Sequence, residues 1–190
     1  MTRLKIEVRR LLLLRAAHGR ATLGRRIMLG ARVGCKVDPG GYLAIRDHCE
    51  IRTGVLLDVW GELTIGARTF VGQGTVIGAQ ERIEIGTDCL IGEYVTIRDQ
   101  DHGIADTSRA IREQGYKVAP VHIGDNVWLG AKVTVCKGVS IGTGCVVGAN
   151  SVVTHTLPPY SVAIGAPARV MRQRTGETRR DETHAYPAHH

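Results

Sequence analysis

The stretch from Val121 to Val153, VHIGDNVWLGAKVTVCKGVSIGTGCVVGANSVV, decides the fold of this 190-residue chain. An aliphatic residue stands at every sixth position, and four of the six are followed by glycine. The fourth residue after each of the first five is small or β-branched. A period of six is neither the 3.6-residue period of a helix nor the alternation of an amphipathic strand. The aliphatic series is Ile123, Leu129, Val135, Ile141, Val147 and Val153.

A six-residue period is typical of a β-helix. Each hexad supplies one short strand and one corner, and three hexads form one coil of a triangular prism. The two apolar positions of each hexad point inward and stack on their equivalents in neighbouring coils. Glycine, asparagine and aspartate suit the corners because they tolerate left-handed backbone. A helix is excluded because glycine at this density would cost roughly 1 kcal/mol per site.

The same period extends towards the N-terminus. An aliphatic residue or proline recurs every six residues from Ile27 to Leu63, and after two-residue shifts the count resumes at Ile65 and at Ile85. We therefore expect an all-β chain that forms a parallel β-helix of about six coils. The predicted coils cover residues 27–62 (two coils), 65–82, 85–102 and 123–158 (two coils).

Both ends of the chain differ from the repeat. Residues 1–36 hold ten lysines or arginines against one acid, Glu7, so the net charge of +7 is concentrated there and the remainder is no basic nucleic-acid surface. Residues 1–26 are expected to form a helical or extended cap on the first coil. Contact of this segment with an anionic membrane or polyanionic partner stays open as the second interpretation. We expect a β-helix domain over 27–174 and a disordered tail over 175–190.

One long excursion interrupts the repeat. Twenty residues, 103–122, separate the hexad IRDQDH from the next coil at Ile123. Long insertions in a regular stack are usually functional. His102 lies where the excursion leaves the prism, directly after a polar approach that contains Asp99 and Asp101. This histidine is the foremost candidate for chemistry.

The five cysteines contain no CxxC pair. Cys49, Cys89 and Cys145 fall on the small inward position of their hexads, whereas Cys35 and Cys136 are predicted at corners. A reducing, cytoplasmic location fits this usage better than a disulfide framework does. No apolar run is long enough for a transmembrane span, and no signal peptide is recognisable at the N-terminus.

The hexads and the motifs DQDHG, IGDNVWLGA, VVGANSVV and IGAPARV occur in the order and spacing of one family. Over residues 27–174 the chain resembles the hexapeptide-repeat, left-handed β-helix acyltransferases. It is most similar to the O-acetyltransferase branch of maltose, galactoside and polysaccharide-cluster enzymes. The resemblance implies the left hand, a homotrimer with sites between adjacent prisms, acetyl-CoA as the donor, and a sugar-like acceptor.

The resemblance also implies roles for particular residues. His102 would be the general base that deprotonates a sugar hydroxyl, oriented by Asp99, Asp101 or a backbone carbonyl. The backbone N–H of Ala131 would stabilise the oxyanion. Arginines suit the phosphates of the cofactor because they bind bidentately. The residues implied in coenzyme A binding are Gly130, Ala131, Ala149, Thr154, His155, Arg169 and Arg172.

Three positions depart from the family pattern. His155 stands where members usually have lysine, and Ala166 stands where asparagine is common, which puts the phosphate contacts in doubt. Gly72 stands approximately where the maltose and galactoside enzymes have an acceptor-site asparagine, so their sugar preference does not carry over.

Other functions remain as alternatives at this point. The same prism serves N-acetyltransferases and antibiotic acetyltransferases. It also serves γ-class carbonic anhydrases, but their zinc-ligating histidine pair, five residues apart, has no counterpart here, and no metal is predicted. A non-catalytic scaffold is the third alternative.

Overall fold

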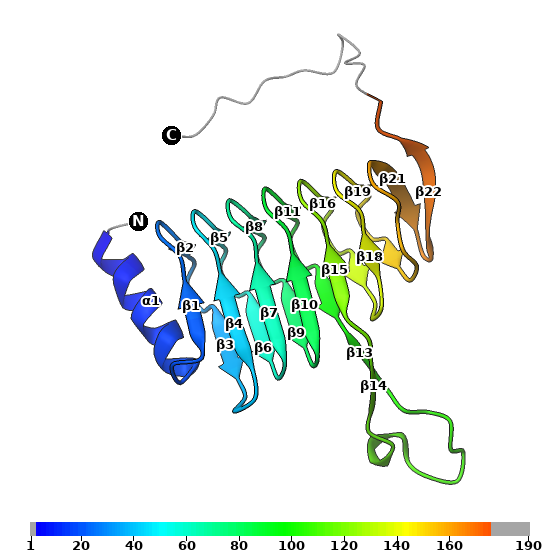
Figure 1. The fold of residues 1–190 in the computed structure, drawn as a ribbon, viewed down its shortest axis with the longest axis horizontal. Helices are drawn as coiled ribbons and strands as arrows, with labels where there is room; N and C mark the ends of the chain where they lie inside the picture. Colours follow the sequence, from blue (N-terminus) through cyan, green and yellow to red (C-terminus); the bar gives the residue numbers. More distant parts are fainter. Residues whose placement is uncertain (1–2, 176–190) are drawn as a thin grey trace.

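The computed structural model describes residues 3–175, and they form a triangular prism of stacked coils (Figure 1). Three parallel sheets run along its faces. The first sheet contains β1 (Ala21–Leu23), β4 (Tyr42–Ile45), β7 (Glu62–Ile65), β10 (Arg82–Ile85), β15 (Val121–Ile123) and β18 (Ser140–Ile141). The second contains β2 (Met28–Leu29), β5 (Glu50–Ile51), β8 (Phe70–Val71), β11 (Leu90–Ile91), β16 (Trp128–Leu129), β19 (Val146–Val147), β21 (Ser161–Gly165) and, antiparallel at its edge, β22 (Ala168–Gln173). The third contains β3 (Gly34–Val37), β6 (Leu56–Val59), β9 (Val76–Ala79), β12 (Thr96–Arg98), β17 (Thr134–Val135) and β20 (Val152–Val153).

The core is a set of aliphatic columns that run the length of the prism. Ile45 pairs with Ile65, Ile65 with Ile85, Ile85 with Ile123, and Ile123 with Ile141. All five side chains are buried. The six-residue period therefore arises from the stacking of inward residues between coils, as predicted. The predicted all-β architecture of parallel coils is confirmed. Six complete coils are followed by a partial seventh turn, in which Leu157 bridges to Ile141 and β21 pairs with β19.

The start of the prism differs from the sequence prediction. Leu23 pairs with Ile45 and Leu29 with Ile51, so the first coil begins at Ala21 rather than at residue 27. The predicted start was wrong because the six-residue count followed the wrong one of the two inward positions in the first coil. Ile27 is buried, but it occupies the small inward position of its hexad, and a longer corner at residues 38–41 resets the count before β4.

Cys35 was also misplaced by this phase error. The thiol lies on β3 opposite Leu57 instead of at a corner, and burial raises its pKa to about 11. Cys49, Cys89 and Cys145 are buried at the inward positions predicted for them.

The N-terminal segment caps the first coil, as expected. Helix α1 (Arg3–Ala16) lies across the open end of the prism, and Leu13 and Ala17 are buried in its core (Figure 1). The guanidinium of Arg9 donates to the carbonyl of Leu29 at 2.8 Å, and that of Arg10 donates to the carbonyl of Gly24 at 3.0 Å. Part of the positive charge therefore satisfies edge carbonyls. No helix in the described part of the chain is long and apolar enough to cross a membrane.

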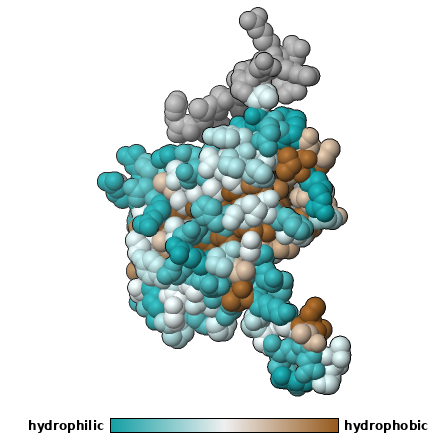
Figure 2. Space-filling view, turned by 45° about the vertical axis from the view of Figure 1, so that its right-hand side comes forward, coloured by the Kyte–Doolittle hydropathy of each residue, from teal (hydrophilic) through white to brown (hydrophobic). Residues whose placement is uncertain are grey.

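The excursion begins and ends as a hairpin. β13 (Gln100–His102) pairs antiparallel with β14 (Tyr116–Val118), and a short 3₁₀ helix, η1 (Ile111–Glu113), lies beyond it. The hairpin projects from the prism between β12 and β15 (Figure 1). Ile104 and Ile111 are exposed on this projection. Figure 2 shows hydrophobic surface on the projecting part of the molecule.

One inward column alternates thiols and hydroxyls that bond to the next coil. The Cys49 Sγ donates to the Gly66 carbonyl at 3.0 Å, the Thr69 hydroxyl donates to the Gly86 carbonyl at 2.8 Å, and the Cys89 Sγ donates to the Gly124 carbonyl at 3.2 Å. Threonine and cysteine at equivalent positions thus donate the same hydrogen bond to a carbonyl of the next coil. Burial is the main reason that the pKa values of the Cys49 and Cys89 thiols are raised, so these thiols are poor nucleophiles.

This equivalence predicts that Cys89→Thr changes the free energy of unfolding by no more than about 1 kcal/mol, because the hydroxyl replaces the thiol as donor. Cys89→Ala removes the donor and leaves a small cavity, so it should destabilise the protein more than Cys89→Thr does. Chemical denaturation of both variants checks the order. A threonine variant that is less stable than the alanine variant would contradict it.

Candidate functional site

The neck of the hairpin positions His102. The backbone of His102 pairs with that of Tyr116, and the next residue, Gly103, donates its N–H to the Gly115 carbonyl at 2.9 Å. A Cβ atom on Gly103 would lie 2.5 Å from the Gln114 carbonyl oxygen. Only glycine allows the two strands to approach this closely. The DQDHG motif therefore places its histidine by the backbone geometry of the hairpin.

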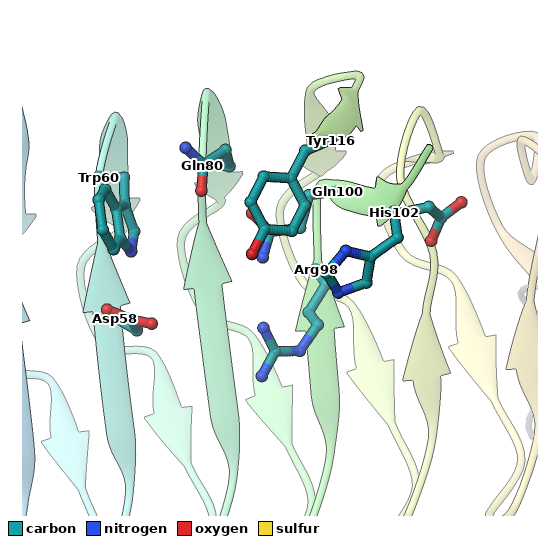
Figure 3. A pocket seen from close by; sticks show the side chains of 8 residues that line it. Asp58, Trp60, Gln80, Arg98, Gln100, His102 and Tyr116 are labelled. Atoms are coloured by element: carbon teal, nitrogen blue, oxygen red, sulfur yellow. The ribbon is translucent and has the colours of Figure 1, made fainter. Parts of the chain in front are cut away.

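The His102 imidazole faces a cavity of about 570 Å³. Its ring centroid lies 4.7 Å from that of Tyr116, at an interplanar angle of 38°. Neither ring nitrogen has a hydrogen-bond partner among the described residues, and the side chain is exposed. Both ring nitrogens are therefore available for hydrogen bonds to a bound molecule. The remaining walls are formed by Asp58, Trp60, Gln80, Arg98, Gln100, Asp101 and Tyr116 (Figure 3).

Asp99 does not orient the imidazole, contrary to one of the alternatives above. Its carboxylate is completely buried and accepts backbone N–H bonds from Gln80 at 2.7 Å, from Glu81 at 2.8 Å and from Arg82 at 2.7 Å. It ties the corner of the preceding coil to the base of the hairpin. The Asp101 carboxylate is exposed and lies 3.5 Å from the Lys137 ammonium.

A second hollow, of about 460 Å³, lies on the second sheet. Its apolar wall contains the exposed side chains of Leu90 and Trp128. Three of the residues predicted to bind coenzyme A line it together: Gly130, Ala131 and Ala149. The small residues follow from tight stacking, because a Cβ on Gly130 would lie 2.6 Å from the Ala149 backbone nitrogen. A ligand can therefore lie close to the backbone along this groove.

The backbone N–H of Ala131 donates no hydrogen bond within the described residues. It therefore remains available to an oxyanion at the edge of the groove.

The other four residues predicted to bind coenzyme A lie outside both hollows. Thr154 and His155 follow β20, and the Thr154 Oγ1 lies 2.8 Å from the His155 Nδ1. Arg169 and Arg172 lie on β22, the last strand of the sheet that carries the groove. All four are exposed at the C-terminal end of the prism.

Within one chain, the structure does not bring all the predicted residues together. The cavity of His102 lies on the third sheet and the hairpin, whereas the groove of Ala131 lies on the second sheet. The two hollows therefore face different directions from one prism.

Near the cavity, the Cys136 thiol offers no better nucleophile. Burial, and then the charge of Asp101, raise its pKa above the ordinary value for cysteine. A raised thiol pKa lowers the fraction of thiolate at neutral pH.

The sequence prediction missed most of the cavity wall. Asp58, Trp60 and Gln80 belong to no motif, and Arg98 and Gln100, although they lie in the hexad IRDQDH, were given no role. A signal was nevertheless present, because Trp60, Gln80 and Gln100 recur at intervals of 20 residues, which is the length of one coil with its insert.

The comparisons with known proteins concern the family and the fold. The family model described as the hexapeptide repeat of succinyl-transferase matches residues 120–155. A putative lipopolysaccharide biosynthesis O-acetyltransferase of Escherichia coli is 32% identical over 157 residues, which cover 78% of this chain and 80% of that protein. A probable acetyltransferase of Mycobacterium tuberculosis is 41% identical over 114 residues, or 60% of this chain. The chain spans 38% of the length of this mycobacterial relative.

A solved structure extends the comparison to a ligand. The hexapeptide-repeat-containing acetyltransferase of Vibrio cholerae, complexed with acetyl coenzyme A, superposes with a TM-score of 0.64 at 27% identity. The match covers 88% of this chain and 76% of the Vibrio protein.

The role found for Asp99 generates a stability prediction. Asp99→Ala would leave the N–H groups of Gln80, Glu81 and Arg82 without their shared acceptor, so we expect a loss of about 3 kcal/mol in the free energy of unfolding. Asp101→Ala is the matched control, because its exposed ion pair contributes no more than about 0.5 kcal/mol. Urea denaturation measures both. Equal stability of the two variants would refute the structural role of Asp99.

Proposed function

We propose that this chain, which belongs to the hexapeptide-repeat acyltransferase family, transfers an acetyl group from acetyl-CoA to a hydroxyl of a sugar or sugar-containing acceptor. The observation that carries the proposal is the unpartnered His102 imidazole, which faces a polar cavity at the neck of the hairpin. The Escherichia coli relative is named as an O-acetyltransferase, and the Vibrio structure holds acetyl coenzyme A. Both support the donor and the acceptor atom proposed here.

In this mechanism the neutral imidazole of His102 removes the proton of the acceptor hydroxyl. The hydroxyl oxygen attacks the thioester carbonyl carbon, and the carbonyl oxygen becomes an oxyanion. The free N–H of Ala131 stabilises that charge by a preorganised hydrogen bond. When the intermediate collapses, the imidazolium returns the proton to the departing thiolate, so that coenzyme A leaves as a thiol.

The donor would lie along the groove of the second sheet. The small side chains of Ala131 and Ala149 allow the pantetheine arm to approach the backbone. The guanidinium groups of Arg169 and Arg172 lie at the end of the same sheet and suit the phosphates of coenzyme A. Neither group forms an ion pair with a carboxylate within residues 3–175. His155 and Thr154 belong to the same proposed phosphate end.

A trimer explains why the two hollows lie on different faces. The base and the oxyanion donor must meet at one thioester, so the His102 cavity of one chain must face the Ala131 groove of a neighbour. Such a contact joins two different surfaces, and three copies can close it into a ring. The exposed Leu90 and Trp128, and the apolar residues on the projecting hairpin, supply surface for this contact.

The role of His102 predicts that His102→Ala lowers kcat by on the order of 10²–10⁴, the usual contribution of a general base. Affinity for coenzyme A should stay within about twofold, because the imidazole lies outside the groove. Thiol release from acetyl-CoA measures the rate, and calorimetry measures the affinity. His122→Ala is the matched control, since this histidine is exposed on the first sheet, where its Nδ1 contacts Glu84 at 3.3 Å.

Three results are informative about the base. A near-normal rate in the His102 variant excludes it as the base. Loss of affinity together with rate would assign it to holding the hairpin instead. Equal losses in both histidine variants would point to a general effect of removing imidazoles.

The proposed assembly predicts a mass in solution of about three times 20.6 kDa by light scattering. Ile111→Glu should dissociate the trimer and abolish turnover together, because it places a charge in the apolar contact of the projecting hairpin and lies outside both hollows. A fully active monomer would exclude the shared site.

A further inference from the structure

Helix α1, which lies across the end of the prism, has apolar residues on two opposite faces (Figure 1). Leu13 and Ala17 are buried against the first coil. Val8, Leu11 and Leu12 are three and four residues apart and share the outward face, where they are 50%, 56% and 57% exposed. A helix that only capped the prism would turn polar residues towards water. The capping role therefore does not account for the outward face.

Two charges of the helix point the other way. The guanidinium groups of Arg9 and Arg10 extend towards the prism, where they donate to the carbonyls of Leu29 and Gly24. Cationic groups thus face the protein, while aliphatic groups face solvent. In water the reverse arrangement would be more favourable, because exposed aliphatic surface gains nothing there. This distribution is typical of a helix whose outer surroundings are partly apolar.

Three exposed arginines at the same end of the prism have no counter-ion. Arg15 lies in the last turn of α1, Arg26 lies between β1 and β2, and Arg32 lies between β2 and β3. None of their guanidinium groups forms a hydrogen bond or an ion pair with another residue in the described part of the chain. Uncompensated positive charge therefore accompanies the exposed aliphatic face.

A hollow of about 300 Å³ opens between α1 and the first coil. Leu12 and Leu13 line it from the helix, Leu29 and Val33 line it from the coil, and Arg32 contributes to the same wall. An apolar hollow beside an unpaired guanidinium suits a molecule that has a hydrocarbon chain and an anionic headgroup. The hollow is continuous with the outward face because Leu12 belongs to both.

We infer that this end of the prism docks on an anionic lipid surface. The docking end consists of the outward aliphatic residues of α1 and the three unpaired arginines. The aliphatic side chains enter the boundary between headgroups and acyl chains, and the guanidinium groups bind lipid phosphates. Each arginine near such a surface contributes about 1 kcal/mol, which is about fivefold in partitioning. The inference does not depend on the proposed acyl transfer. The docking end comprises Val8, Leu11, Leu12, Arg15, Arg26 and Arg32.

The aliphatic face distinguishes lipid from other anionic partners. A nucleic acid or another soluble polyanion would bind through the arginines, and its affinity would come from phosphate contacts and released counterions. Exposed leucines on α1 would add nothing to such binding. A lipid surface uses both kinds of side chain.

The contribution of charge is tested with the double variant Arg26→Gln and Arg32→Gln. Its matched control is Arg68→Gln with Lys132→Gln. Arg68 stands two coils further along the corner column of Arg26, and Lys132 stands four coils further along that of Arg32. All four residues have left-handed backbone, with φ between 52° and 59°. Both double variants lower the net charge equally.

Binding is measured by co-sedimentation with vesicles of equimolar phosphatidylglycerol and phosphatidylcholine. We expect the wild-type protein to bind these vesicles and not vesicles of phosphatidylcholine alone. The docking-end double variant should bind about 25-fold more weakly, because two charges of about fivefold each are removed. The control double variant should bind less than about threefold more weakly.

The contribution of the aliphatic face is tested with Leu11→Glu. Met171→Glu is the control, because Met171 is 64% exposed on β22 at the opposite end of the prism. Leu11→Glu should weaken vesicle binding by more than about tenfold, since it replaces an inserting side chain by an anion. Thiol release without vesicles should equal that of the wild-type protein, so this test is separate from the test of acyl transfer.

Several results would overturn lipid docking. These are no binding to the anionic vesicles, equal binding to both kinds of vesicle, and docking-end variants that behave like their controls. Binding to heparin that Leu11→Glu leaves unchanged, without binding to vesicles, would assign the arginines to a soluble polyanion. A mass without vesicles that exceeds the trimer and falls to it in Leu11→Glu would assign the face to a second copy of the chain. Melting temperatures equal to that of the wild-type protein establish that each variant is folded.

Discussion

Parallel pairing between successive coils is the constraint on which every other feature of this protein depends. Neighbouring coils exchange backbone hydrogen bonds in both directions, as from the Gly24 N–H to the Ile45 carbonyl and from the Leu43 N–H to the Arg20 carbonyl, so the inward residues must repeat at the same height in every turn. The column Ile45, Ile65, Ile85 satisfies this requirement with fully or almost fully buried side chains. A slip of one residue would turn such a column outward. Variation in chain length is therefore confined to corners.

The variation in this chain is concentrated at one edge of the prism. The longer corner at residues 38–41, the two-residue inserts and the hairpin all lie between a strand of the third sheet and the next strand of the first. Asp99 connects these additions, because its buried carboxylate accepts N–H bonds from Gln80, Glu81 and Arg82. The placement of His102 and the shape of its cavity thus share one structural support.

The sequence predicted what depends on repetition and failed where repetition is ambiguous. Coils from Ile45 onward were recognised because each inward aliphatic residue has a counterpart one coil later. In the first coil, Ile27 occupies the other inward position, so a count by hydrophobicity alone could not distinguish the two phases. His102 was found because it adjoins the single long interruption.

The cavity wall was not predicted, because the 20-residue recurrence of Trp60, Gln80 and Gln100 does not by itself show that these side chains line one cavity. That Asp58 lies on the same cavity depends on how successive coils stack, which requires coordinates. The separation of the His102 cavity from the Ala131 groove likewise depends on which sheet each residue occupies. Sequence spacing gives coils but not the orientation of two hollows about the prism axis.

The caps at the two ends of the prism determine whether further coils can add to the stack. Every coil of the prism has the same unpaired edge, so the repeat alone does not determine how many coils are stacked. An uncovered edge could pair with a coil of another molecule, and the stack could grow into a filament. At one end, Arg9 and Arg10 occupy edge carbonyls beneath α1, and at the other, β22 reverses direction. The non-repeating segments therefore cover the unpaired edges, and they prevent further coils from adding to the stack.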